Sequence, residues 1–131
     1  MEPSLHPVEI HPSLIGALGV IEFDLIPFIP RRCYWVSGVP NGQIRGQHAH
    51  KTLSQLLVVS FGEVEVETIN RLGERHHFRL TTSEGLLIPP GNWREITFSQ
   101  PETSLVVFAS AKYDEADYIR DFKTFEEWAG I

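Results

Sequence analysis

The chain has 131 residues, which suits one domain that buries a core without a disulfide or a metal. Its formal net charge is −6 and no cluster of lysines and arginines stands out, which argues against a nucleic-acid partner. Cys33 is the only cysteine, so an intrachain disulfide is excluded and a reducing compartment is favoured. An anionic small ligand stays open, because a few arginines can converge in one pocket.

The N-terminal residues do not resemble a targeting segment. Met1–Gly16 has neither a basic start nor a long apolar run, and no apolar stretch reaches ~18 residues. We therefore expect a cytoplasmic protein with no membrane partner. Prolines at positions 3, 7, 12, 27, 30 and 40 predict an irregular segment over residues 1–19.

From residue 20 onward, short β-rich segments alternate with turns of Gly, Pro, Ser and Asn. Leu53–Ser60 is nearly all apolar, as in a strand buried on both faces. Glu63–Thr68 alternates, so its valines are expected to face inward and its glutamates to face water. Many short strands at regular spacing predict an all-β sandwich or closed barrel. The predicted strands are Val20–Leu25, Arg32–Ser37, Leu53–Ser60, Glu63–Thr68, His76–Leu80, Gly85–Ile88, Glu95–Phe98 and Ser104–Ser110.

Helix is predicted only in a C-terminal tail over residues 114–131. Asp114 can cap a helix that begins at Glu115, and Lys123–Ala129 fits a second helix. Apolar side chains of this tail are expected to pack on the outside of the barrel. They are Tyr118, Ile119, Phe122, Phe125 and Trp128.

Two histidines, His48 and His50, carry the main chemical signal. Residues two apart on a strand point to the same face, so both imidazoles enter one cavity if that face is the barrel interior. The segment resembles the first cupin motif, with Gly42, His48, His50 and Gly62 in place. Pro89-Pro90-Gly91 resembles the centre of the second motif. Together the motifs indicate a single cupin, or jelly-roll, β-barrel over residues 1–131, with short C-terminal helices.

Two positions depart from the three His and one Glu that bind metal in cupins. Gln55 stands at the Glu position, and Arg94 stands where the third His would be. An amide is a poor metal ligand, and a guanidinium keeps its positive charge near neutral pH and disfavours a divalent cation. We therefore expect no metal and no cofactor. Arg94 and Arg45 instead suit an anionic ligand or an oxyanion.

Four stretches in matching order resemble the dTDP-sugar 3,4-ketoisomerases, the WxcM-like cupins of deoxysugar biosynthesis. They are Arg31–Val36, Arg45–Gln55, Pro89–Glu95 and Phe108–Arg120. The most specific matches are to the family's RGxHAH and YDExDYIR elements. The resemblance implies a homodimer of jelly-roll barrels whose partner is a dTDP-linked keto-sugar. It further implies that dTDP-4-keto-6-deoxy-glucose becomes a dTDP-3-keto-6-deoxy-hexose without a metal.

The residues present agree with this chemistry, because an imidazole with a pKa near ~6.5 can both take and give protons. We predict that one of His48 and His50 removes the C3 proton and the other shuttles protons through an enediol, with Tyr34 in the proton relay. Which histidine is the base stays open. The predicted substrate-binding residues are Arg32, Arg45, Gln55, Trp93, Arg94 and Glu95.

Three alternatives remain at this stage. The dTDP-sugar 3,5-epimerases share the barrel and an Arg-Gly-x-His segment but tend to lack the second histidine, so His50 counts against them. A metal cupin such as a dioxygenase is disfavoured by Gln55 and Arg94. The third alternative is a sugar-binding barrel without catalysis. The stereochemistry at C4 and the nucleotide carried are not decided by the sequence.

Overall fold

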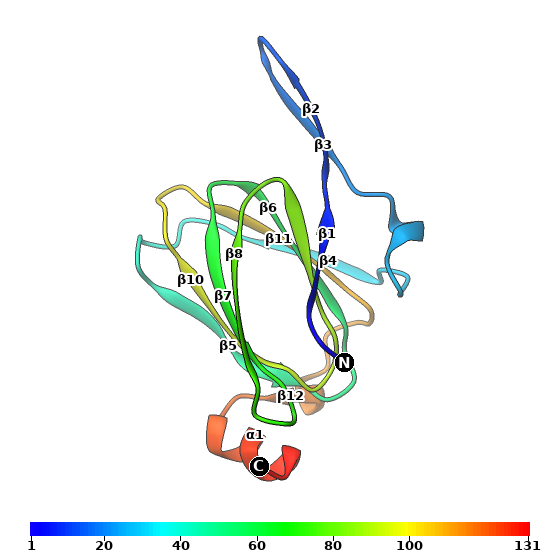
Figure 1. The fold of residues 1–131 in the computed structure, drawn as a ribbon, viewed down its shortest axis with the longest axis vertical. Helices are drawn as coiled ribbons and strands as arrows, with labels where there is room; N and C mark the ends of the chain where they lie inside the picture. Colours follow the sequence, from blue (N-terminus) through cyan, green and yellow to red (C-terminus); the bar gives the residue numbers. More distant parts are fainter.

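The computed structural model describes residues 1–131 as an all-β cupin barrel of the jelly-roll type, which confirms the predicted fold class (Figure 1). Two five-stranded antiparallel sheets form the barrel. The first sheet contains, in spatial order, β1 (Ser4–Pro7), β9 (Glu84–Ile88), β6 (Gln55–Phe61), β11 (Ser104–Ala109) and β4 (Arg32–Val36). The second contains β12 (Tyr118–Ile119), β5 (Ile44–His50), β10 (Trp93–Phe98), β7 (Val64–Ile69) and β8 (Arg75–Leu80).

The hydrophobic core lies between the sheets, because alternate residues of each strand point inward. Val64 and Val66 are fully buried there, as their alternation predicted. Glu63 was expected to face water, and this was wrong. It lies just before β7, is buried, and accepts hydrogen bonds from Arg79 (2.5 and 3.1 Å) and Gln100 (2.6 Å). A buried carboxylate is tolerated here because each oxygen has a partner.

The N-terminal segment was predicted to be irregular over residues 1–19, and this was wrong. It forms β1 and a hairpin of β2 (Glu9–Ser13) and β3 (Gly16–Val20), which projects from the barrel (Figure 1). Pro12 is accommodated because a two-stranded ribbon has free edges, where a missing N–H costs no ladder bond. The strand predicted over Val20–Leu25 is also wrong beyond residue 20, because residues 23–25 form the short 3₁₀ helix η1 (Phe23–Leu25).

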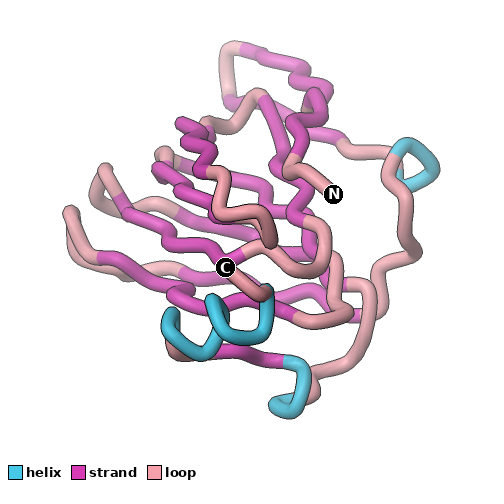
Figure 2. Tube along the Cα trace, turned by 60° about the horizontal axis from the view of Figure 1, so that its bottom comes forward, coloured by secondary structure: helices cyan, strands magenta, loops and turns pink.

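The other predicted strands are confirmed, with ends that differ by no more than two residues. The tail is only partly helical. Asp114 caps the 3₁₀ helix η2 (Glu115–Asp117), the two-residue strand β12 follows, and the helix α1 (Phe122–Ala129) ends the fold. The helices lie outside the strands in Figure 2. None of the helices combines the length and the apolar composition that a membrane span requires.

Candidate active site

A cavity of about 410 Å³ lies between the two sheets. One part of its wall is apolar and belongs to the barrel core. These apolar residues are Val36, Leu57, Ile96, Phe98, Leu105 and Val107. The other part carries charged groups, hydroxyls and an imidazole. These polar residues are Arg32, Tyr34, Arg45, His48, Gln55, Arg94, Tyr113, Tyr118 and Arg120. A cavity of this size with convergent polar groups is typical of a small-molecule site.

A β-bulge in β5 brings Arg45 and His48 to the same wall. Residues three apart on a regular strand point to opposite faces. Opposite β10, however, Arg94 pairs with His48 and Ile96 pairs with Arg45, so β5 has one residue more than its partner in this interval. Gly46 takes up the extra residue at φ +69, a left-handed conformation that glycine adopts without strain. Both side chains therefore line the cavity.

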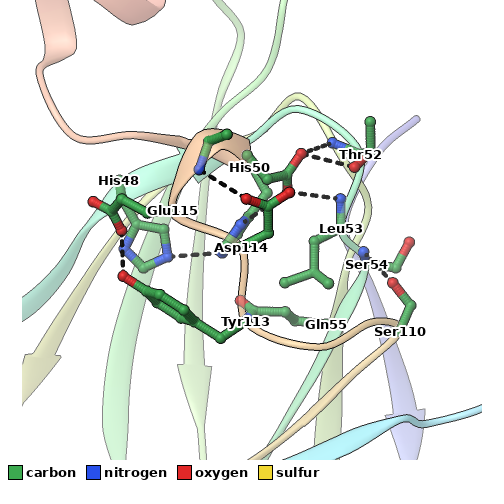
Figure 3. Close-up of polar contacts among 12 residues, drawn as sticks. His48, His50, Thr52, Leu53, Ser54, Gln55, Ser110, Tyr113, Asp114 and Glu115 are labelled. Carbon is green, nitrogen blue, oxygen red and sulfur yellow. Dashed lines mark hydrogen bonds and ion pairs between the residues drawn. The ribbon is translucent and has the colours of Figure 1, made fainter.

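The imidazoles of His48 and His50 contact each other edge to face. Their Nε2 atoms are 3.1 Å apart and their ring centroids are 4.8 Å apart (Figure 3). His48 lines the cavity, whereas His50 is fully buried behind it. The predicted pair is therefore brought together, but only His48 borders the main cavity.

Both histidines are neutral at pH 7. Burial lowers the pKa of His48 to about 2, with a further decrease from the nearby positive charges of Arg94 and a protonated His50. Burial also lowers the pKa of His50 to about 3, with further decreases from Arg94 and Arg32. A hydrogen bond between two neutral imidazoles requires one Nε2 to donate and the other to accept. The tautomers of the two rings are therefore linked: the ring whose Nε2 donates has a free lone pair on Nδ1, and the ring whose Nε2 accepts carries its proton on Nδ1.

Arg94, Gln55 and Tyr34 form a hydrogen-bonded chain in the wall. Arg94 Nη1 donates to Gln55 Oε1 at 2.5 Å, and Gln55 Nε2 donates to the hydroxyl of Tyr34 at 3.1 Å. Burial lowers the pKa of Arg94 to about 10, which still leaves it charged at neutral pH, and burial raises the pKa of Tyr34. The Tyr34 oxygen accepts from Gln55, so its own proton is free to be donated into the cavity.

The two residues that replace metal ligands therefore bind each other. No group of three or more His, Cys, Asp or Glu side chains is placed to hold a metal ion. With the Gln55 oxygen taken by the fixed charge of Arg94, the donor set does not fit the three His and one Glu of metal cupins.

Trp93 and Glu95 lie on the opposite face of β10 from Arg94 and do not border the cavity. The Trp93 ring packs against Phe122 and Phe125, with centroids 5.3 and 6.0 Å apart, in the apolar cluster beneath α1. Its Nε1 donates to Glu95 at 3.3 Å. The alternation of β10 puts Arg94 and Ile96 inward. Trp93 and Glu95, which were predicted to bind the substrate, therefore point away from the cavity.

Residues 113–120 supply site residues that the sequence analysis did not assign. Tyr118 was expected to pack on the outside with the tail, and this was wrong. β12 pairs Tyr118 with His50, and the tyrosine ring lies 4.3 Å from the His50 ring and 5.1 Å from the His48 ring. Arg120 stacks on Tyr118 at 4.1 Å and binds Glu115 through two hydrogen bonds of 2.6 and 2.8 Å. The resemblance of this stretch to the YDExDYIR element was the sequence signal that could have identified these site residues.

Comparison with known proteins gives consistent relatives. The family model FdtA, described as "WxcM-like, C-terminal", matches residues 1–130. A TDP-4-oxo-6-deoxy-α-D-glucose-3,4-oxoisomerase of Aneurinibacillus thermoaerophilus is 32% identical over 114 residues, which cover 86% of this chain and 82% of that protein.

Solved structures of sugar isomerases are similar over almost the whole chain. QdtA, a sugar 3,4-ketoisomerase of Thermoanaerobacterium thermosaccharolyticum in complex with TDP, is 33% identical with a TM-score of 0.89 and covers 98% of this chain and 94% of its own. A 3,4-ketoisomerase of Helicobacter canadensis is 29% identical with a TM-score of 0.89, covering 100% and 99%. A dTDP-4-dehydrorhamnose 3,5-epimerase of Bacillus anthracis, 14% identical with a TM-score of 0.80 over 89% of this chain and 77% of its own, shares the fold.

Proposed function

The chain belongs to the FdtA family of WxcM-like proteins and is an isomerase of the dTDP-sugar 3,4-ketoisomerase class, and we propose that His48 and His50 move the protons in its reaction. The proposed substrate is dTDP-4-keto-6-deoxy-glucose, since a variant of QdtA that is 32% identical to this chain was solved in complex with TDP-4-keto-6-deoxyglucose. The product is a dTDP-3-keto-6-deoxy-hexose, an intermediate suited to deoxysugar biosynthesis. The observation that carries the assignment is the neutral imidazole pair beside a buried arginine.

His48 is the proposed base, because it borders the cavity while His50 lies behind it. The C3–H bond breaks, its proton goes to His48, and its electrons form a C3=C4 double bond, which leaves an enediolate oxygen at C4 that then takes up a proton. The resulting enediol then accepts a proton at C4 and loses the proton of the C3 hydroxyl, which leaves a carbonyl at C3. The 3.1 Å contact of His50 with His48 and the hydroxyl proton that Tyr34 keeps free support a role for both residues in passing these protons.

The charges around the pair fit this transfer. A lone imidazolium at His48 is opposed by burial and by Arg94. Proton transfer from the sugar, however, creates an enediolate beside the imidazolium, so the new charges attract each other. Arg94 and Arg45 can stabilise the same oxyanion, and such stabilisation is often the largest contribution to a rate. The lowered pKa of His48 in the protein without substrate therefore opposes proton transfer less once the substrate is bound.

Arginines at the cavity also suit the nucleotide diphosphate. Arg32, Arg45 and Arg120 all line it, although the whole chain has a net charge of −6. Arg32 lies over the rings of Tyr34 and Tyr113 at 5.1 and 5.6 Å, which holds its guanidinium at the wall. A guanidinium fork matches phosphate oxygens well. We assign the pyrophosphate to this group of arginines and the sugar to the interior beside His48.

A homodimer in the cytoplasm completes the proposal. Leu14 and Ile15 at the tip of the β2–β3 hairpin are almost completely exposed, and Leu18 of β3 is 61% exposed. A cavity of about 940 Å³ lies between this hairpin and the outer face of the first sheet, where Phe61 and Phe108 line it. Exposed apolar surface of this kind favours association with a second copy. Sedimentation velocity of the full chain measures the state directly. The unpaired Cys33 suits a reducing compartment.

The test is incubation with dTDP-4-keto-6-deoxy-glucose in deuterated water, followed by NMR of the sugar protons. Deuterium at C4 of a 3-keto product is the expected result, and the C4 coupling then gives the stereochemistry. H48N and H50N should lose turnover while keeping the fold, and H77N, which removes an exposed histidine of the second sheet, is the matched control. Exchange at C5 would instead indicate an epimerase, and turnover retained in both histidine variants would refute the assignment.

A further inference from the structure

Asp117 binds the turn that follows β5. Its Oδ1 accepts hydrogen bonds from the backbone N–H of Thr52 at 2.8 Å and from the Thr52 hydroxyl at 2.7 Å, and its Oδ2 accepts from the N–H of Leu53 at 3.1 Å. Its backbone carbonyl accepts from the N–H of Lys51 at 3.0 Å. These bonds fix the carboxylate, whose side chain is 13% exposed, in one orientation.

The fixed carboxylate lies next to the inner histidine. Oδ2 of Asp117 is 3.3 Å from Nδ1 of His50, and this buried Nδ1 makes no hydrogen bond in the structure, so the carboxylate acts on it through its charge. A lone pair on Nδ1 would be repelled by the carboxylate, whereas an N–H is attracted by it. The electrostatics therefore favour the His50 tautomer that carries its proton on Nδ1.

That choice determines the proton positions on His48. If Nδ1 of His50 carries the proton, its Nε2 is an acceptor, so Nε2 of His48 must be the donor across the 3.1 Å contact. The nitrogen of His48 without a proton is then Nδ1, for which the chain provides no hydrogen-bond donor. Only a nitrogen with a free lone pair can take a proton from carbon.

We propose that Asp117 is a positioning residue that sets the tautomers of His50 and His48, so that Nδ1 of His48 is the free base. The inference rests on the proposed ketoisomerase reaction for its catalytic meaning, but the tautomers themselves do not depend on it. Asp117 does not touch the substrate in this assignment and acts through His50.

The D117N variant should reverse the tautomers of His50 and His48. The two bonds from Thr52 require an oxygen at the Oδ1 place, so the amide nitrogen occupies the Oδ2 place and faces His50. It then donates to Nδ1 of His50, Nε2 of His50 becomes the donor, and Nδ1 of His48 carries the proton. The base is blocked while the fold loses one hydrogen bond, from Leu53.

The experiment is ¹⁵N NMR of the two imidazoles near pH 7 in the full chain labelled at histidine, with long-range ¹H–¹⁵N correlations. We expect a protonated Nδ1 on His50 and a protonated Nε2 on His48 in the wild type, and the opposite pattern in D117N. In deuterium-exchange assays, kcat of D117N should fall by about a hundredfold or more with KM little changed.

D114N is the matched control, because Asp114 caps η2 through the N–H of Ala116 and makes no hydrogen bond or ion pair with either histidine. It should keep both the wild-type tautomers and kcat. A proton on Nε2 of His50 in the wild type would overturn the proposal, even if D117N failed to fold. Unchanged tautomers in a folded D117N would overturn it as well. Neither NMR result depends on the substrate, so a failure of the proposed reaction is recognised separately.

Discussion

The buried histidine pair should make the free energy of unfolding decrease as the pH falls below about 6.5. In the unfolded chain, an imidazole takes up a proton near that pH. In the fold, the pKa of His48 is lowered to about 2 and that of His50 to about 3. Between these values the unfolded state binds more protons than the folded state, so stability is present at neutral pH and is lost as the pH falls.

The size of the effect follows from the width of this window. Each histidine that is neutral in the fold and protonated on unfolding removes about 1.4 kcal/mol per pH unit. Between pH 8 and pH 5 this amounts to about 2 kcal/mol for each histidine and about 4 kcal/mol for the pair. H48N should therefore lose only about half as much stability over the same range. The range stops at pH 5 because at lower pH the protonation of carboxyls would also change the free energy of unfolding. The carboxyls concerned are those of Glu63, Glu115 and Asp121, whose pKa values are lowered by their partners.

Urea unfolding at pH 8, 7, 6 and 5 measures this dependence, with one protein concentration throughout because association also affects stability. H77N is the control, since it also removes one imidazole, but one whose side chain is 57% exposed and pairs with Glu65. The reasoning is refuted if wild type and H48N lose stability in parallel, because His48 would then be protonated in the fold.

Three further substitutions test the packing and the faces of the strands. G62A should lower the free energy of unfolding by about 2 kcal/mol in urea titrations, because the residue has φ +85 and a Cβ would lie 2.2 Å from the Thr103 hydroxyl; stability equal to wild type would contradict this. W93A should lower the free energy of unfolding by about 3–5 kcal/mol in the same titrations, since it leaves a cavity in the apolar cluster under α1. E95Q should leave kcat/KM within about twofold, because the side chain faces away from the cavity, and a large loss would place it in the site.

The strands of the barrel were predictable because their hydrophobic pattern has the period of a sheet. Leu53–Ser60 and Glu63–Thr68 differ from β6 and β7 by at most two residues at each end. The N-terminal hairpin was missed because its signal is mixed: prolines and exposed leucines do not alternate, and its pairing depends on a two-stranded ribbon that needs no buried face. Local pattern alone therefore fails where burial does not set the structure.

The spacing of the cavity residues was only partly visible in the sequence. The two-residue spacing of His48 and His50 predicted that they share one face of the strand but not the contact between their rings. The motif departures at Gln55 and Arg94 predicted their polar role but not their bond to each other. Alternation along β10 implies that Trp93 and Arg94 lie on opposite faces, but which of them faces the cavity is not set by the local pattern. The position of Tyr118 depends on the pairing of β12 with β5. Such pairings are tertiary and leave no local periodicity.

The attachment of β12 has a consequence for local opening. Tyr118 and Arg120 belong to a segment that joins the barrel through two paired residues, the hydrogen bonds of Asp117 to residues 51–53 and the contacts of α1, whereas β6 and β11 lie inside a five-stranded sheet. Segments with few buried contacts open at a lower free energy than the core. Amide hydrogens of Lys51 and Leu53, which donate to Asp117, should then exchange faster than those of β6. On heating, the segment with Tyr118 and Arg120 can therefore unfold locally while the barrel is still folded.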